Sequence, residues 1–129
     1  MDEVRLTLPP ERQWQNVAHL VLSGLAARLD MTLEVLEDWQ IALAELFARQ
    51  RGERGVEVVF QTSKDCLTLR FGPASTQLLA ELEQGGDGVG LRRVLSTLFD
   101  SVESDLSGDD YWVVLTRAVE HPSEASDAN

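Results

Sequence analysis

The chain has 129 residues, of which 43% are hydrophobic, and its formal net charge is −11. This length and composition predict one globular domain with its own core, not a disordered chain. An acidic surface repels phosphate backbones, so we expect no direct binding to nucleic acid. The acidity either favours a basic protein partner or only keeps the protein soluble.

The first fifty residues predict one strand and two helices. Residues 4–8 alternate apolar and polar side chains, and two prolines end that strand. Apolar residues then recur at helical spacing from Trp14 to Leu29. Thr32 can cap a second helix, which should run to about Gln50. Three tryptophans are expected in the core: Trp14, Trp39 and Trp112.

The middle of the chain predicts a β-hairpin and a short helix. Residues 56–61 and 66–71 both alternate in polarity, and the polar segment TSKD joins them. Residues 74–84 are compatible with a short helix. Residues 85–90, GGDGVG, then form a glycine-rich loop.

The last third predicts a helix, a strand and a tail. Apolar residues recur at helical spacing over residues 91–102, with a short extra strand near residues 101–106, and residues 109–119 form a closing strand. Residues 121–129 are small, polar and acidic, so we expect a disordered tail after a domain of residues 1–120. A hairpin and grouped helices favour an α+β sandwich over a doubly wound sheet.

Few residues suggest metal or redox chemistry. A single cysteine, Cys66, excludes an internal disulfide and favours a reducing compartment, and its place in an alternating strand predicts a buried side chain. His19 and His121 lack metal-ligand spacing.

We find neither a charged-then-apolar leader nor an apolar run of about 20 residues, so we expect a cytoplasmic protein without membrane contact.

Three segments, taken in order, carry a resemblance to a known family. In VAHLVLSGLAARLDMTLEVLEDWQIALAEL, a first helix is followed by a Glu-Asp-x-x-x-Ala-x-x-Glu helix. GDGVGLRRVLSTLFDSVE looks like a glycine loop, a helix and the start of a strand after an ATP lid, and WVVLTRAV is similar to the last strand of such a fold. Together, over about residues 4–119, they resemble the anti-sigma-factor serine kinases of the histidine-kinase/Hsp90-like ATPase superfamily. The matching residues of the second helix are Glu37, Asp38, Ala42 and Glu45.

This resemblance implies both a fold and a role. The fold is a two-layer α+β sandwich, with a mixed, mostly antiparallel sheet and helices on one face. In the implied role, the protein holds a sigma factor away from RNA polymerase. It also uses ATP to phosphorylate a serine of an antagonist protein.

The family's Glu-x-x-x-Asn box is incomplete in this chain. In the family the Glu helps to activate the attacking group, and the Asn oxygen ligates the magnesium that bridges the nucleotide phosphates. Here Glu45 matches the Glu, but Arg49 stands at the Asn position. Arginine has no acceptor atom and cannot ligate magnesium. We interpret Glu45 as a vestigial catalytic residue, paired with Arg49 in a surface i,i+4 ion pair that contributes about 0.3–0.5 kcal/mol.

The family's second box, Asp-x-Gly after the third strand, is missing. Its Asp accepts a hydrogen bond from the adenine amino group. The matching segment is RFGPASTQ, where the Asp would fall near Gly72 or Pro73. No carboxylate occurs between Asp65 and Glu81, so adenine would lose its main specific polar contact.

The remaining nucleotide-site feature is a glycine-rich loop, comprising Gly85, Gly86, Gly88 and Gly90. The helix after it can present N–H groups to a phosphate, although many ordinary loops share this composition. Asp87 would repel a phosphate unless a cation intervened. Arg92 and Arg93 either offset that charge or form a solvated helix face.

A preserved scaffold with two lost boxes predicts an anti-sigma-like regulator. It would bind a protein partner, a sigma factor or its antagonist, without ATP, magnesium or kinase activity. Its acidic half, residues 71–129, contains 11 acidic and 3 basic residues (net −8) and suits a basic partner. One alternative is an active ATP- and magnesium-dependent serine kinase that uses Glu45. Another is a scaffold subunit that dimerises with an active homologue, and a homodimer is also compatible.

Overall fold

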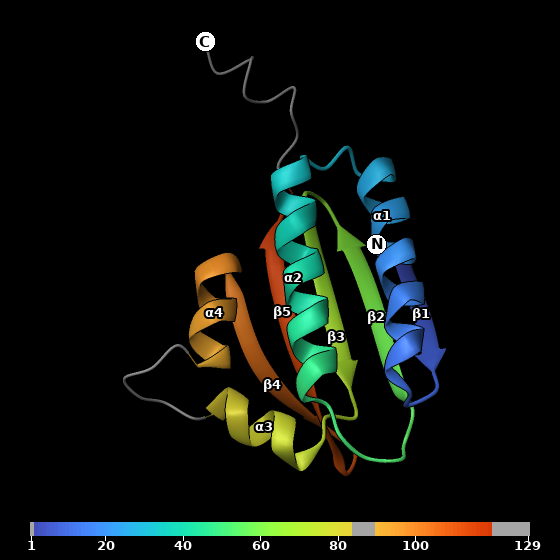
Figure 1. Cartoon of the computed structure of the whole chain (residues 1–129). Helices are drawn as coiled ribbons and strands as arrows, with labels where there is room; N and C mark the ends of the chain where they lie inside the picture. The colour runs from blue at the N-terminus through green and yellow to red at the C-terminus, as the bar shows by residue number, and fades with distance from the viewer. Residues whose placement is uncertain (1, 84–89, 120–129) are drawn as a thin grey trace.

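A five-stranded antiparallel sheet underlies the fold (Figure 1). The computed structural model describes residues 2–83 and 90–119. Within these residues the strand order is β1-β2-β3-β5-β4, and every neighbouring pair is antiparallel. The implied parallel component is not found there, because β4 and β5 form a hairpin and β5 returns beside β3. The strands are β1 (Asp2–Leu8), β2 (Val56–Ser63), β3 (Cys66–Gly72), β4 (Ser101–Ser107) and β5 (Asp110–Ala118).

The helices cover one face of this sheet (Figure 1). They are α1 (Gln15–Arg28), α2 (Leu33–Arg49), α3 (Thr76–Glu83) and α4 (Leu91–Leu98), with a short 3-10 helix, η1 (Arg12–Trp14), before α1. This arrangement confirms the predicted α+β class with helices on one face. Among the described segments, no helix has both the length and the apolar content needed to cross a bilayer.

Most of the predicted local structure is confirmed. The Val35 N–H donates to Thr32 Oγ1 at 3.3 Å, so Thr32 caps α2 as expected. β2 and β3 pair as the predicted hairpin. The extra strand forms as β4, and Val102 therefore pairs with Leu115 of β5 instead of extending α4, which ends at Leu98.

The apolar face of α2 is packed into the core between the sheet and the other helices. Trp39 and Leu43 are fully buried, and the Trp39 ring lies 4.6 Å from the ring of Phe99. Phe47 contacts Phe71 of β3 edge to face, with ring centroids 5.1 Å apart. Because each such buried side chain contributes about 1.5–3 kcal/mol, this face holds α2 in one position on the sheet.

Three side chains expected in the core lie elsewhere. Trp14 is 37% exposed, because it belongs to η1 and falls outside the buried stripe of α1. Trp112 and Cys66 are half-buried on the face of the sheet without helices. They alternate along their strands with Val113 and Leu67, whose side chains point into the core. The sequence pattern marks the strands correctly but assigns these two side chains to the wrong face.

Trp112 packs against a glycine on this helix-free face. A Cβ atom added at Gly72 would lie 2.6 Å from Trp112 Cδ2, a separation that real Cβ atoms essentially never show. The Arg70 guanidinium lies 5.6 Å from the centroid of the Trp112 ring, and Arg70 Nη2 donates to Asp105 of β4 at 2.9 Å. The missing side chain at Gly72 therefore makes room for the tryptophan, which in turn supports Arg70.

Replacing Gly72 by alanine is expected to lower the free energy of unfolding by about 1–3 kcal/mol, because the Trp112 ring must move. Urea unfolding followed by tryptophan fluorescence measures this loss. Gly24→Ala is the matched control: Gly24 is exposed within α1, and an added Cβ there meets no atom within 4 Å. This variant should gain about 1 kcal/mol through helix propensity. Unchanged stability of Gly72→Ala would show that the ring relaxes without cost.

Candidate functional site

The incomplete Glu-x-x-x-Asn box forms an ion-pair cluster between α2 and α3. Arg49 Nη1 donates to Glu45 Oε1 at 2.6 Å, which confirms the predicted i,i+4 pair. Arg49 Nε also donates to Glu81 Oε1 on α3 at 3.1 Å. The second carboxylate lies 32 positions away in the chain, so helical spacing could not reveal it.

This cluster is less exposed than a simple surface pair. The side chains of Arg49, Glu45 and Glu81 are 25%, 34% and 35% exposed. Gln77 Nε2 donates to the second oxygen of Glu81 at 3.3 Å, which orients that carboxylate toward α2. Arg49 therefore ties α3 to α2, a structural role beyond the local pair that the sequence predicts.

The cluster does not suit the magnesium ion that the resemblance implies. Hard cations require oxygen ligands, whereas the arginine presents only N–H donors. Glu45 already accepts a charge-assisted hydrogen bond from the guanidinium. In residues 2–83 and 90–119, no group of three or more His, Cys, Asp or Glu side chains is arranged to hold a metal.

The other matching residues of α2 have different surroundings. Asp38 Oδ2 accepts a hydrogen bond from Arg117 Nη1 of β5, which ties α2 to the sheet. Ala42 is fully buried, and its small side chain permits close packing. Glu37 is exposed. Two of the residues that carry the resemblance, Asp38 and Ala42, therefore support the fold.

Gln50 holds the loop that follows β3. Its Nε2 donates to the Pro73 carbonyl at 2.8 Å, and its Oε1 accepts from the Ser75 N–H at 2.9 Å. Ser75 Oγ in turn accepts from the Leu78 N–H at 3.2 Å and caps α3. This loop is where the Asp-x-Gly box is expected, and it presents a clamped backbone in place of a carboxylate.

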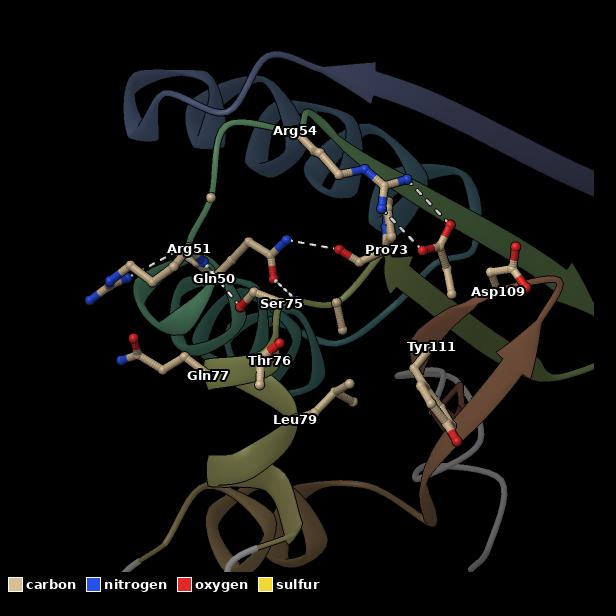
Figure 2. Close-up of a pocket in the computed structure, with 13 residues that line it drawn as sticks. Gln50, Arg51, Arg54, Pro73, Ser75, Thr76, Gln77, Leu79, Asp109 and Tyr111 are labelled. Atoms are coloured by element: carbon tan, nitrogen blue, oxygen red, sulfur yellow. Dashed lines mark hydrogen bonds and ion pairs between the residues drawn. The ribbon is translucent and has the colours of Figure 1, made fainter.

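A polar pocket of about 550 Å³ opens beside this loop (Figure 2). The segment after α2, the first turn of α3 and the β4–β5 turn line it. Its volume lies in the usual range for small-molecule sites. The sequence did not predict it, because three segments far apart in the chain form it. Its polar lining includes Gln50, Arg51, Arg54, Ser75, Thr76, Gln77, Asp109, Asp110 and Tyr111.

Two carboxylates line this pocket from the β4–β5 hairpin: Asp109, which is labelled in Figure 2, and Asp110. Asp110 accepts two hydrogen bonds from the Arg54 guanidinium, at 3.0 and 3.3 Å. These hydrogen bonds lower the pKa of the Asp110 carboxyl and raise the pKa of Arg54. Both side chains are exposed to solvent, so the pair stabilises the fold only weakly. The Asp110 carboxylate is thus already engaged by a base, whereas Asp109 forms no ion pair among the described residues.

Most of the predicted glycine loop lies outside the described residues: Gly85, Gly86 and Gly88. Asp87 lies outside them as well. Gly90 is described and serves as the N-cap of α4, where its carbonyl accepts the Val94 N–H at 3.1 Å. The structure therefore shows a helix-starting role for Gly90 and leaves the phosphate cradle as a prediction.

The two arginines after this loop differ in their surroundings. Arg92 Nε donates to the Leu82 carbonyl at 3.1 Å, and Arg92 Nη1 donates to the Val102 carbonyl at 3.0 Å. Arg92 thus joins the end of α3 to β4 and is not part of a solvated helix face. Arg93 is exposed, as the solvated alternative requires.

The histidine and cysteine predictions concern isolated side chains. His19 Nε2 lies 3.2 Å from Gln15 Nε2, and burial lowers the pKa of His19. Cys66 is half-buried and reduced, in contrast to the buried position expected. His121 and the predicted tail of residues 121–129 lie outside the described residues.

Removing Arg49 should cost more than breaking one exposed ion pair. Arg49→Ala is expected to lower the free energy of unfolding by about 1 kcal/mol, because two carboxylates on adjacent helices lose their shared base. A double-mutant cycle with Glu81→Ala should give a coupling of about 0.5–1 kcal/mol, weaker at about 1 M salt.

Arg51→Ala is the matched control for this cycle. Arg51 Nη1 donates only to the backbone carbonyls of Ala48 and Gln50, so it should show no coupling with Glu81. Zero coupling between Arg49 and Glu81 would contradict the bridge.

Comparison with known proteins does not assign this chain to a family. No family model matches the sequence, and a search of curated proteins finds no significant match. The likeness to the anti-sigma-factor serine kinases therefore depends on the three segments quoted above. The α+β sheet with helices on one face is compatible with that likeness.

Proposed function

We propose that this chain is a regulatory protein that binds a protein partner and lacks kinase activity. The partner would be a sigma factor or the antagonist of one, as in the family that the chain resembles. In this role the chain acts in the cytoplasm by covering a surface of its partner. It needs neither ATP nor magnesium to do so.

The Arg49 bridge is the observation that carries this proposal. A nucleotide-bound magnesium ion would need an oxygen ligand at position 49, where the chain has a cation. An arginine can contact a phosphate, but this one already donates to Glu45 and Glu81. A phosphate at the remaining Nη2 donors would lie close to these two carboxylates, whose negative charge opposes its binding.

The loop after β3 supports the same proposal. The Pro73 carbonyl and the Ser75 N–H are both bonded to Gln50, and the loop contributes no carboxylate for an adenine amino group. Asp110 lines the adjacent pocket, but it is bonded to Arg54. Asp109 also lines the pocket, but it lies exposed on the β4–β5 turn and not in the loop after β3, where the family's Asp stands. A pocket without that Asp at its place would discriminate poorly for ATP.

Calorimetric titration with Mg-ATP tests the loss of nucleotide binding. The wild-type protein is expected to show no binding tighter than about 10 μM. Tighter binding would overturn the proposal and favour the alternative, an active serine kinase that uses Glu45.

Two arginine variants identify the cause of the loss. Arg49→Asn supplies an oxygen at the expected ligand position, whereas the control Arg28→Asn changes an exposed arginine at the end of α1 that does not line the pocket beside Pro73. Magnesium-dependent binding gained by Arg49→Asn alone would assign the loss to Arg49. If neither variant binds, the loss extends to the loop after β3.

A further inference from the structure

An apolar groove of about 340 Å³ lies between α2 and α4, which stand side by side over the sheet (Figure 1). Its lining consists of Ile41 of α2 and of Arg93, Val94, Thr97 and Leu98 of α4. Ile41 is 45% exposed, and both Val94 and Leu98 are half-buried. The groove therefore presents a patch of apolar side chains to solvent, as surfaces that bind other proteins do.

The two helices run in opposite directions along this groove. The ring of Phe99, which follows α4, lies 4.6 Å from the ring of Trp39 in the first half of α2. At the other end of α4, Arg92 donates to the Leu82 carbonyl near the end of α3, and an ion pair ties α3 to the end of α2. The start of α4 therefore lies toward the end of α2.

The two ends of the groove carry opposite charges. Glu34 and Glu37 are exposed on α2, seven and four residues before Ile41, so they lie on the same side of the helix. Neither carboxylate has a partner among the described residues. Asp100, just after α4, adds an acid at this end and accepts a backbone N–H of β5. At the other end Arg93 is exposed and forms no ion pair within residues 2–83 and 90–119. The carboxylates of the nearby cluster between α2 and α3 are already bonded to their shared base.

This arrangement fits a helix better than a small molecule. The stretch of α2 from Glu34 to Ile41 covers two turns, about 10 Å, and Arg93 lies toward the opposite end of the groove. A small molecule would not reach both charged ends, whereas an amphipathic helix of about four turns would. Its apolar residues at helical spacing would cover Ile41 and Leu98. Basic residues at one of its ends would meet Glu34 and Glu37, and an acidic residue at the other would meet Arg93.

We propose that the α2–α4 groove docks an amphipathic helix of the protein partner, with a basic end against Glu34 and Glu37 and an acidic residue near Arg93. Burial of apolar surface would supply the affinity, and the opposite charges at the two ends would fix the direction of the helix. This inference rests on the proposed function, because it names the surface with which a partner-binding protein would hold its partner. A second copy of the chain is the competing occupant, and its docking would make the protein dimeric.

Binding of a model helix to the whole protein tests the inference. The probe is a peptide of about 18 residues with leucines on one face, glutamates in its first turn and lysines in its last turn. The control peptide has the same composition, with its leucines spread around the helix. We expect only the leucine-faced peptide to bind, more weakly at higher salt, and to shift the methyl NMR signals of Ile41, Val94 and Leu98.

A pair of apolar variants locates the binding surface. Ile41→Ser should weaken binding of the leucine-faced peptide by about tenfold, because it removes an exposed apolar side chain from the groove. Leu20→Ser makes a similar change at a leucine of α1 that is 72% exposed and lies outside the groove. This control should leave the affinity within about twofold.

A pair of charge variants tests the acidic end of the groove. Glu34→Gln combined with Glu37→Gln should weaken binding by about threefold or more and reduce its dependence on salt. Glu11→Gln combined with Glu53→Gln removes the same charge at two exposed positions outside the groove and should leave the affinity within about twofold. Circular dichroism checks that all variants remain folded.

Three results would overturn the inference: no binding of the leucine-faced peptide, equal weakening by a groove variant and its control, or a dimer in light scattering that Ile41→Ser dissociates and Leu20→Ser does not. The last result would assign the groove to a second copy of the chain. None of them affects the Mg-ATP titration, which tests the loss of nucleotide binding. Conversely, tight Mg-ATP binding would overturn the proposed function without displacing the peptide from the groove. The two failures are therefore distinguishable.

Discussion

The rest of the structure depends on the burial of the apolar face of α2 against the sheet. Trp39, Leu43 and Phe47 fix the rotation of this helix, and α2 runs across the middle of the sheet with α1 on one side and α3 and α4 on the other (Figure 1). Once the rotation of α2 is fixed, the positions of the polar residues beside its apolar face are fixed too, and so are the residues that they can contact. Asp38 meets β5, and Arg49 meets α3.

Arg49 affects both the magnesium site that the resemblance implies and the contact between α2 and α3. As a cation it cannot serve as the oxygen ligand that a magnesium–nucleotide complex needs. As a long, forked donor it spans Glu45 and Glu81 and holds α3 over the end of α2. An arginine in place of the family's asparagine thus removes a possible oxygen ligand and adds an ion pair between two helices. Gln50, the next residue, clamps the loop after β3 in the same region. The end of α2 therefore holds both α3 and the loop after β3 in place.

Acidic residues lie on both edge strands of the sheet, and not all of them have a basic partner. At the β1 edge a single base, Arg5, is shared by Glu3 and Glu57. At the β4 edge Arg70 pairs with Asp105, and Glu103 has no basic partner among the described residues. Unbalanced charge on a strand edge keeps identical molecules apart and attracts molecules of opposite charge. Both effects would serve the proposed partner binding, because the molecules would stay apart from one another and would favour a partner of opposite charge.

Local patterns in the sequence determined the secondary structure: the alternation in β2 and β3, the cap at Thr32, the helical spacing of α2 and the extra strand β4. They also determined the Glu45–Arg49 pair, because residues four apart on a helix are neighbours. Only the tertiary structure decided that Glu81 joins that pair, that Asp110 reaches the pocket beside Pro73, and that Trp112 lies on the helix-free face. Each of these depends on segments distant in the chain, or on which face of a strand is covered, and alternation alone does not say which face that is.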